Sequence, residues 1–121
     1  MGLDQSVYWI DEEDFVGDIE NPREDYFDTD IYYWRKFYSL NNWMSDLWEK
    51  KGGKREDFNC SHMRLYPEDI DQLEKDMEKD DFWIYEWEYE EREEHKADLK
   101  KFIDMIRTEY SDCIIVYHPW W

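Results

Sequence analysis

The sequence predicts a single α+β domain over residues 1–121, with three helices packed on a small, mostly antiparallel sheet. In three stretches, apolar residues recur at spacings of three and four, which is the pattern of helices buried along one side. Shorter aromatic and β-branched stretches, typical of strands, lie near both ends of the chain and before the last helix. The chain is 41% hydrophobic, which is enough to form one core.

The first part of the chain is expected to form a strand, a loop and a helix. The strand is predicted over Leu3 to Ile10, and the acidic stretch 15–30, interrupted by Gly and Pro, is predicted as a surface loop. A helix is predicted over Ile31 to Lys50, because its apolar stripe has helical spacing and two glycines follow it. The stripe consists of Trp34, Phe37, Leu40, Met44, Leu47 and Trp48.

A loop over residues 52–66 follows, and then a second helix. Next to this loop lies a local cluster of positive charge, formed by Lys50, Lys51, Lys54 and Arg55. Pro67 suits a first helical turn, and Glu68 and Asp69 favour the positive end of the helix dipole. The apolar stripe of this helix is narrow (Ile70, Leu73, Met77), so its remaining surface is almost wholly acidic.

Between Phe82 and Tyr89 the pattern changes to a two-residue period, which predicts a strand. A third helix is predicted over Arg92 to Tyr110, and a last strand over Cys113 to Tyr117. We expect the sheet to contain the N-terminal strand, the strand over 82–89 and the C-terminal strand. The side chains expected to be mostly buried are Trp34, Phe37, Leu40, Met44, Leu47, Leu73, Phe102, Ile103, Ile106, Ile115 and Val116.

Charge is the strongest indication of function. Thirty-three Asp and Glu oppose fifteen Lys and Arg, giving a net charge of −18. Such a surface repels nucleic acid and anionic membranes and attracts basic proteins. We therefore expect no direct binding of nucleic acid and no membrane association. An acidic coat that serves only solubility is the alternative interpretation.

The cysteines and the N-terminal residues indicate a compartment. Cys60 and Cys113 are far apart and form no CxxC motif, which is typical of a protein from a reducing environment. The start of the chain lacks the basic and apolar regions of a signal peptide. These features predict a cytoplasmic protein.

An ordered series of motifs resembles a group of small proteins from bacteriophages and prophages. The series comprises Met1-Gly2-Leu3-Asp4, Tyr33-Trp34-Arg35-Lys36 and Asn42-Trp43, followed by the helix near Leu65 to Met77 and an aromatic C-terminal strand. The resemblance covers most of the chain and implies a role in the cytoplasm of an infected bacterial cell. This chain has Asn41 where that group tends to have His, and a Gly-free segment over Phe82 to Tyr85 where the group has a Gly-bounded one.

Catalytic and metal-binding motifs are scarce. The sequence has no glycine-rich phosphate loop, nucleophile elbow or HExxH motif, so we expect no catalytic residues, no metal and no cofactor. Two alternatives stay open. Cys60 with His62, or Cys113 with His118, could pair a nucleophile with a base. All four could form a tetrahedral zinc site if the loop lay beside the last strand.

The alternating aromatics Trp83, Tyr85, Trp87 and Tyr89 are a further candidate feature. Stacking platforms for nucleic acid need a basic groove, whereas acidic residues are interleaved with these rings. We expect a sheet face covered by helices. A small-molecule site, for instance for a nucleotide, remains an alternative for this cluster.

The favoured hypothesis is a protein that binds a basic host protein, one that itself binds nucleic acid. Rows of carboxylates would occupy the partner's basic surface as a DNA mimic, in the manner of anti-CRISPR or anti-restriction inhibitors of host defence. A phage accessory or regulatory protein with an ordinary protein partner is the alternative. The carboxylates expected to contact the partner are Glu12, Glu13, Asp14, Asp71, Glu74, Glu78 and Glu90.

Overall fold

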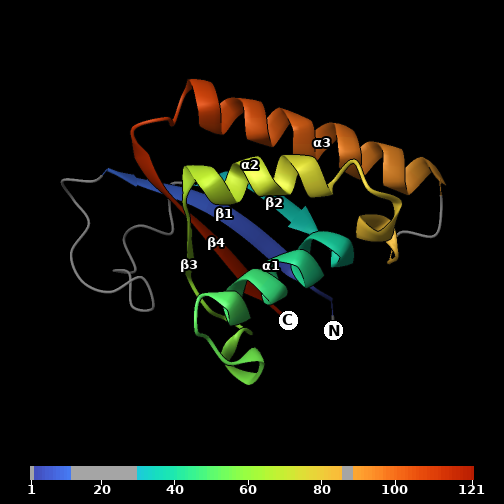
Figure 1. The fold of residues 1–121 in the computed structure, drawn as a ribbon, viewed down its shortest axis with the longest axis horizontal. Coiled ribbons are helices and arrows are strands. Elements are labelled where there is room, and N and C mark those ends of the chain that lie inside the picture. The colour runs from blue at the N-terminus through green and yellow to red at the C-terminus, as the bar shows by residue number, and fades with distance from the viewer. Residues whose placement is uncertain (1, 12–29, 86–88) are drawn as a thin grey trace.

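The computed structural model describes residues 2–11, 30–85 and 89–121. These residues form three α-helices and one four-stranded antiparallel sheet, which confirms the predicted α+β class (Figure 1). The strands are β1 (Asp4–Asp11), β2 (Asp30–Arg35), β3 (Met63–Leu65) and β4 (Cys113–Trp120). The helices are α1 (Tyr38–Lys50), α2 (Pro67–Asp76) and α3 (Tyr89–Thr108), with short 3-10 helices η3 (Arg55–Asp57) and η4 (Asp80–Trp83).

The sheet has the strand order β2-β1-β4-β3. The two strands from opposite ends of the chain are its centre: β1 pairs with β4 from Asp4 opposite Trp120 to Asp11 opposite Cys113. β2 pairs with the other side of β1, and β3 pairs with the other side of β4. Because side chains alternate between the two faces of a sheet, this register decides which residues face the helices.

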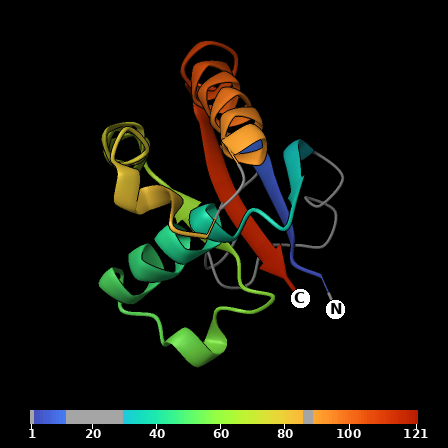
Figure 2. The same cartoon turned by 90° about the vertical axis from the view of Figure 1, so that its right-hand side faces the viewer.

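The helices cover one face of the sheet. Figure 2 shows α1 and α2 on the same side of β1 and β4. Val7, Ile115 and Tyr117 face this side and belong to a core that includes residues of all three helices. The ring of Phe102 from α3 packs edge-on against Trp34 of β2, with centroids 5.2 Å apart. Aromatic burial of this kind is a large favourable term in a small domain.

The opposite face has a smaller cluster of its own. Tyr8, Ile10, Ile114 and Val116 are buried there and pack together. Val116 is therefore buried as predicted, but on the face away from the helices. Of the other side chains predicted to be buried, only Leu47 is partly exposed, and it still packs against the main core.

The predicted first helix was wrong at its start. Residues 31–35 belong to β2, Lys36 adopts a left-handed conformation with φ 61°, and α1 begins at Tyr38. Gln5 of β1 holds this junction, because its side-chain oxygen accepts a hydrogen bond from the Phe37 backbone N–H at 2.9 Å. The aromatic run before Lys36 pairs with β1, and strand pairing suits aromatic and β-branched residues.

The predicted strand over 82–89 was also wrong in its described part. Phe82 and Trp83 lie in η4 and are buried, and residues 86–88 lie outside the described residues. The Trp83 ring stacks on Phe37 at 5.7 Å, and its indole N–H donates to the Met77 carbonyl at 2.8 Å. These contacts direct the Trp83 side chain into the core between the helices and the sheet. The third strand of the predicted sheet is instead supplied by β2, and β3 forms within the predicted loop.

Candidate functional site: the acidic layer of α2, η4 and α3

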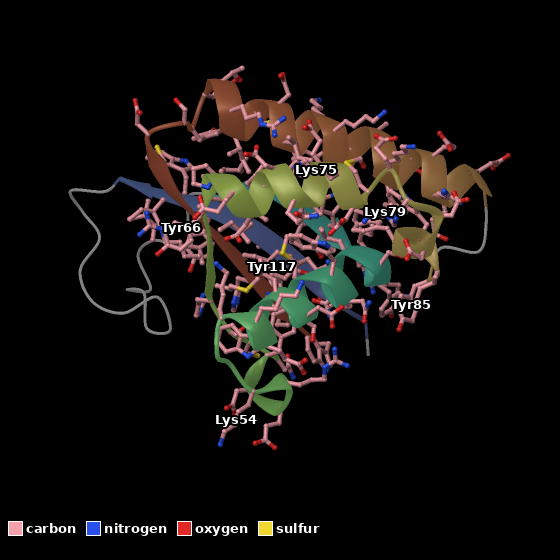
Figure 3. The ribbon with its side chains drawn as sticks, viewed as in Figure 1. Lys54, Tyr66, Lys75, Lys79, Tyr85 and Tyr117 are labelled. Atoms are coloured by element: carbon pink, nitrogen blue, oxygen red, sulfur yellow. The ribbon has the colours of Figure 1, made fainter. Side chains whose placement is uncertain are left out.

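Exposed carboxylates gather on α2, η4 and the first turns of α3, and we call this group the acidic layer. Its members are Glu68, Asp71, Glu74, Glu78, Asp80, Asp81, Glu90, Glu91, Glu93 and Glu94. Figure 3 labels Tyr66 at one end of α2, and Lys79 and Tyr85 at the other end of the helix layer, near η4. Four predicted contact residues belong to the acidic layer, whereas Glu12, Glu13 and Asp14 lie outside the described residues.

Local sequence explains why α2 presents its carboxylates outwards. Ile70, Leu73 and Met77 are buried and lie three and four residues apart, so they form the inner side of the helix. The positions between them then face solvent. At the start of α2, the Tyr66 backbone N–H donates to the Asp69 carboxylate at 2.9 Å, which satisfies one of the amide groups left open at a helix terminus.

Asp71 and Glu74 share one counter-ion. The guanidinium of Arg107 on α3 donates to Glu74 at 2.6 Å and to Asp71 at 2.7 Å. These two hydrogen bonds, first that to Glu74 and then that to Asp71, raise the pKa of Arg107. All three side chains remain substantially exposed. Exposed ion pairs of this kind contribute about 0–1 kcal/mol each.

Glu78 lies between two cations of α3. Its oxygens are 3.4 Å from the Lys96 ammonium and 3.8 Å from the Lys100 ammonium. Asp80, in η4, is bound by Arg92 at 3.0 Å. The ion pairs that link these carboxylates of α2, η4 and the turn between them to α3 therefore all use cations of α3.

Glu90 differs from the carboxylates of α2. It lies in the first turn of α3 beside Glu91, and Glu93 and Glu94 follow it, all four exposed. In the described parts of the chain, no ion pair is found for any of these four carboxylates. Their position at the N-terminus of a helix is favourable, because the helix dipole is positive there.

The cations Lys96, Lys100 and Arg107 were not predicted as part of the site. They lie four and seven residues apart on α3, which places them on one side of the helix. This spacing was the available signal. It shows which carboxylates these cations can reach only once the antiparallel position of α2 beside α3 is known. The spacing of residues within one helix does not reveal which helix lies beside it.

The cysteines and histidines considered for zinc are only partly brought together. The loop carrying His62 does lie beside β4, and the His62 and His118 rings stack with centroids 4.1 Å apart and planes within 4°. Cys113 lies at the other end of β4, five residues and about 16 Å from His118 along an extended strand. The four residues therefore do not form the tetrahedral site considered from the sequence.

The stacked imidazoles also do not suit a shared metal ion. A ring nitrogen binds a metal through a lone pair in the ring plane, and two parallel planes share no such point. The Tyr8 hydroxyl lies 2.9 Å from Nδ1 of His62, and Nδ1 of His118 donates to the Ser61 carbonyl at 2.7 Å. Among the residues described, no group of three or more His, Cys, Asp or Glu is arranged to hold a metal.

Burial governs the chemistry of His62. Desolvation, followed by the positive charge that His118 can carry, lowers the pKa of His62 to about 4. The neutral form is therefore the one present at physiological pH. The nearby thiol of Cys60 is exposed and lies 3.5 Å from the Asn59 side-chain oxygen. The hydrogen bonds of this cluster thus attach the loop before β3 to the sheet.

The alternating aromatics expected to form one strand face are dispersed in the structure. Trp83 is buried in the core, while Tyr85 is 49% exposed in the turn that follows η4. Trp87 lies outside the described residues, and Tyr89 begins α3. The expected common strand face therefore does not form at Trp83 and Tyr85.

No family model, curated protein or solved structure matches this chain. The resemblance to small phage proteins accordingly stays a prediction. None of the described helices is both long and apolar enough to cross a membrane.

Proposed function

We propose that this chain is an acidic binding protein that occupies a basic, nucleic-acid-binding surface of a partner protein through its acidic layer. The observation that carries the proposal is the row of four exposed carboxylates at the start of α3. Glu90, Glu91, Glu93 and Glu94 have no ion pair in the described chain, so they are available to a partner's cations.

The geometry of this row favours a partner that binds nucleic acid. The four carboxylates span about 6 Å of helix axis, because a helix rises 1.5 Å per residue. At 100° per residue they occupy an arc of about 160° on one side of α3. One charge per about 2 Å approaches the density of duplex DNA, which carries one charge per about 1.7 Å of its axis.

The carboxylates of α2 can join the same contact at low cost. Asp71, Glu74 and Glu78 are held by exposed cations of α3, and such pairs are weak. A partner's Lys or Arg can replace these cations without a large loss of stability. The contact surface would then extend along the helix layer from η4 towards Tyr66, at the start of α2.

The resemblance to phage proteins supplies the biological setting of the proposal. A cytoplasmic protein of an infected bacterium that occupies the nucleic-acid-binding surface of a host defence protein would inhibit that defence. The expected partner is therefore a basic bacterial protein that also binds DNA or RNA. The proposal includes no catalytic step, no metal and no cofactor.

Capture from a bacterial extract tests the proposal. The chain is immobilised, bound proteins are identified by mass spectrometry, and each is tested for release by salt and by short duplex DNA. We expect a basic nucleic-acid-binding protein that DNA displaces and whose affinity falls as salt rises, because salt screens exposed charges. A neutral or acidic partner with salt-independent affinity would show that the charge serves only solubility.

A further inference from the structure

A hollow of about 240 Å³ opens between the start of α2 and the end of α3. Ile70 and Ile106 line it from the two helices, and Leu65 and Ile115 line it from the sheet. The thiol of Cys113, which takes part in no disulfide, also borders it. The lining is therefore mainly apolar, although the surrounding helix surface is strongly charged.

Two charged groups border this hollow, one of them from the acidic layer. Asp71 and Arg107 line it, and their ion pair spans the seam between α2 and α3. Arg107 also lines a second hollow of about 380 Å³ further along the seam, where Glu74 and Glu78 face Lys100. The two hollows thus follow each other along the seam between α2 and α3 and share Arg107, and the apolar one lies at the α2 start.

The size of the apolar hollow decides what kind of group it suits. A cavity of about 150 Å³ is large enough for benzene, whereas sites for drug-sized ligands measure about 300–1,000 Å³. At about 240 Å³, the hollow is matched to a single large side chain. Apolar pockets that receive one aromatic anchor, surrounded by polar contacts, are typical of the strongest points in protein interfaces.

We infer that this hollow receives one aromatic side chain of the partner, with Lys or Arg on either side of it in the partner's sequence. The inference rests on the proposed function, because the carboxylates of Asp71, which lines the hollow, and of Glu74, one turn further along α2, suit a basic segment. The aromatic ring contacts Ile70, Ile106 and Ile115, and the flanking cations replace Arg107 on the two carboxylates. Binding then has a part that salt does not screen.

Two synthetic peptides separate the apolar contact from the charge contact. Lys-Lys-Trp-Lys-Lys and Lys-Lys-Ala-Lys-Lys carry the same charge, and each is titrated into the chain while methyl NMR signals are followed. We expect only the Trp peptide to shift the methyl signals of Ile70, Ile106 and Ile115. Both peptides should shift backbone signals of the acidic layer, because both carry cations.

The thiol of Cys113 gives a second measurement at the same place. In the Cys60→Ser variant, Cys113 is the one remaining thiol, and its modification by N-ethylmaleimide reports access to the hollow. The Trp peptide should slow this reaction about threefold at twice its dissociation constant, since about two thirds of the sites are then filled. The Ala peptide should leave the rate unchanged.

A matched pair of adducts tests whether the Trp peptide still binds when the hollow is already filled. An N-ethylmaleimide adduct on Cys113 in the Cys60→Ser variant should abolish the methyl shifts caused by the Trp peptide. The same adduct on exposed Cys60 in the Cys113→Ser variant should leave them intact. If both peptides shift the acidic layer alike and neither shifts the three isoleucines, the inference is wrong and the proposed function stands. If neither peptide shifts the acidic layer, both are wrong.

Discussion

Two consecutive stretches of this chain carry charges of opposite sign. Residues 31–64, which we call the basic block, contain seven Lys and Arg against four Asp and Glu. Residues 67–94, which include the whole acidic layer, contain three Lys and Arg against fourteen Asp and Glu. A coat that serves only solubility does not require such segregation. The difference shows that charge is unevenly distributed along the chain, with a large acidic excess over residues 67–94.

The polar contacts of the two regions also differ in kind. The basic block is attached through buried polar groups: the amide nitrogen of Gln5 donates to the Phe37 carbonyl at 3.1 Å and to the Tyr117 hydroxyl at 2.7 Å. Tyr117 donates in turn to Asn41 of α1 at 2.9 Å, and burial raises the pKa of its phenol. The polar contacts of the acidic layer are exposed ion pairs instead.

The largest expected effect comes from breaking the buried attachment of the basic block. Gln5→Leu leaves the buried Phe37 N–H without its partner and removes one hydrogen bond each from the Phe37 carbonyl and the Tyr117 hydroxyl, and we expect it to lower the free energy of unfolding by about 3 kcal/mol. Urea titration measures this loss. Gln72→Leu on the surface of α2 is the matched control, with an expected loss below about 0.5 kcal/mol. Equal losses in the two variants would contradict the comparison.

Acid should weaken a second attachment of the basic block, the contact of His62 with Tyr8 of β1. Because the pKa of His62 is about 4 in the folded chain and near 6.5 when unfolded, its contribution is present above about pH 6.5 and is lost as pH falls towards 4. Allowing for its partial exposure, we expect a loss of about 1–2 kcal/mol.

His62→Gln provides the comparison for this pH dependence, because the amide keeps a polar group near Tyr8 and does not titrate. Urea titrations of both proteins at pH 7, 5 and 4 should show the native chain losing more stability than the variant. Parallel curves for the two proteins would show that His62 does not cause the acid sensitivity.

The smallest expected effect lies in the acidic layer. Arg107→Gln removes both ion pairs to α2, and we expect it to lower the free energy of unfolding by less than about 1 kcal/mol. Lys101→Gln, an exposed cation of the same helix, is the matched control. Urea titration at low and high salt measures both variants. A loss above about 2 kcal/mol would mean that the ion pairs hold the layer together.

The sequence correctly predicted those elements in which the apolar residues follow one spacing throughout. The α2 stripe of Ile70, Leu73 and Met77 is one example, and the α3 helix is another. It did not predict β2, because Trp34 belongs to a strand yet lies three residues before Phe37, so strand and helix together imitate one continuous stripe. Pairing with β1 overrides that local pattern.

The site was predictable only in its composition. Glu74, Glu78 and Glu90 were expected to be exposed carboxylates, and they are. Which of them have counter-ions depends on how α2 and α3 lie against each other, a property of packing rather than of local sequence. The pairing of His62 with His118 likewise depends on the register of β3 against β4.

Two charge-matched variants test the central claim that the acidic layer is the contact surface. One neutralises the start of α3 through the substitutions Glu90→Gln, Glu91→Gln, Glu93→Gln and Glu94→Gln. The other removes four exposed carboxylates elsewhere, on α1 and η3, through the substitutions Asp46→Asn, Glu49→Gln, Glu56→Gln and Asp57→Asn. Both have the same net charge, and circular dichroism confirms that both are folded.

The decisive measurement is the dissociation constant of each variant for the captured partner at about 0.1 M salt. We expect the α3 variant to bind about tenfold or more weakly, since four contact charges at about 0.4–0.8 kcal/mol each exceed the 1.4 kcal/mol that corresponds to tenfold. The control variant should bind within about twofold of the native chain, because at this salt its neutralised charges are largely screened from the partner. Equal weakening in both variants would contradict the account, since net charge alone would then determine binding.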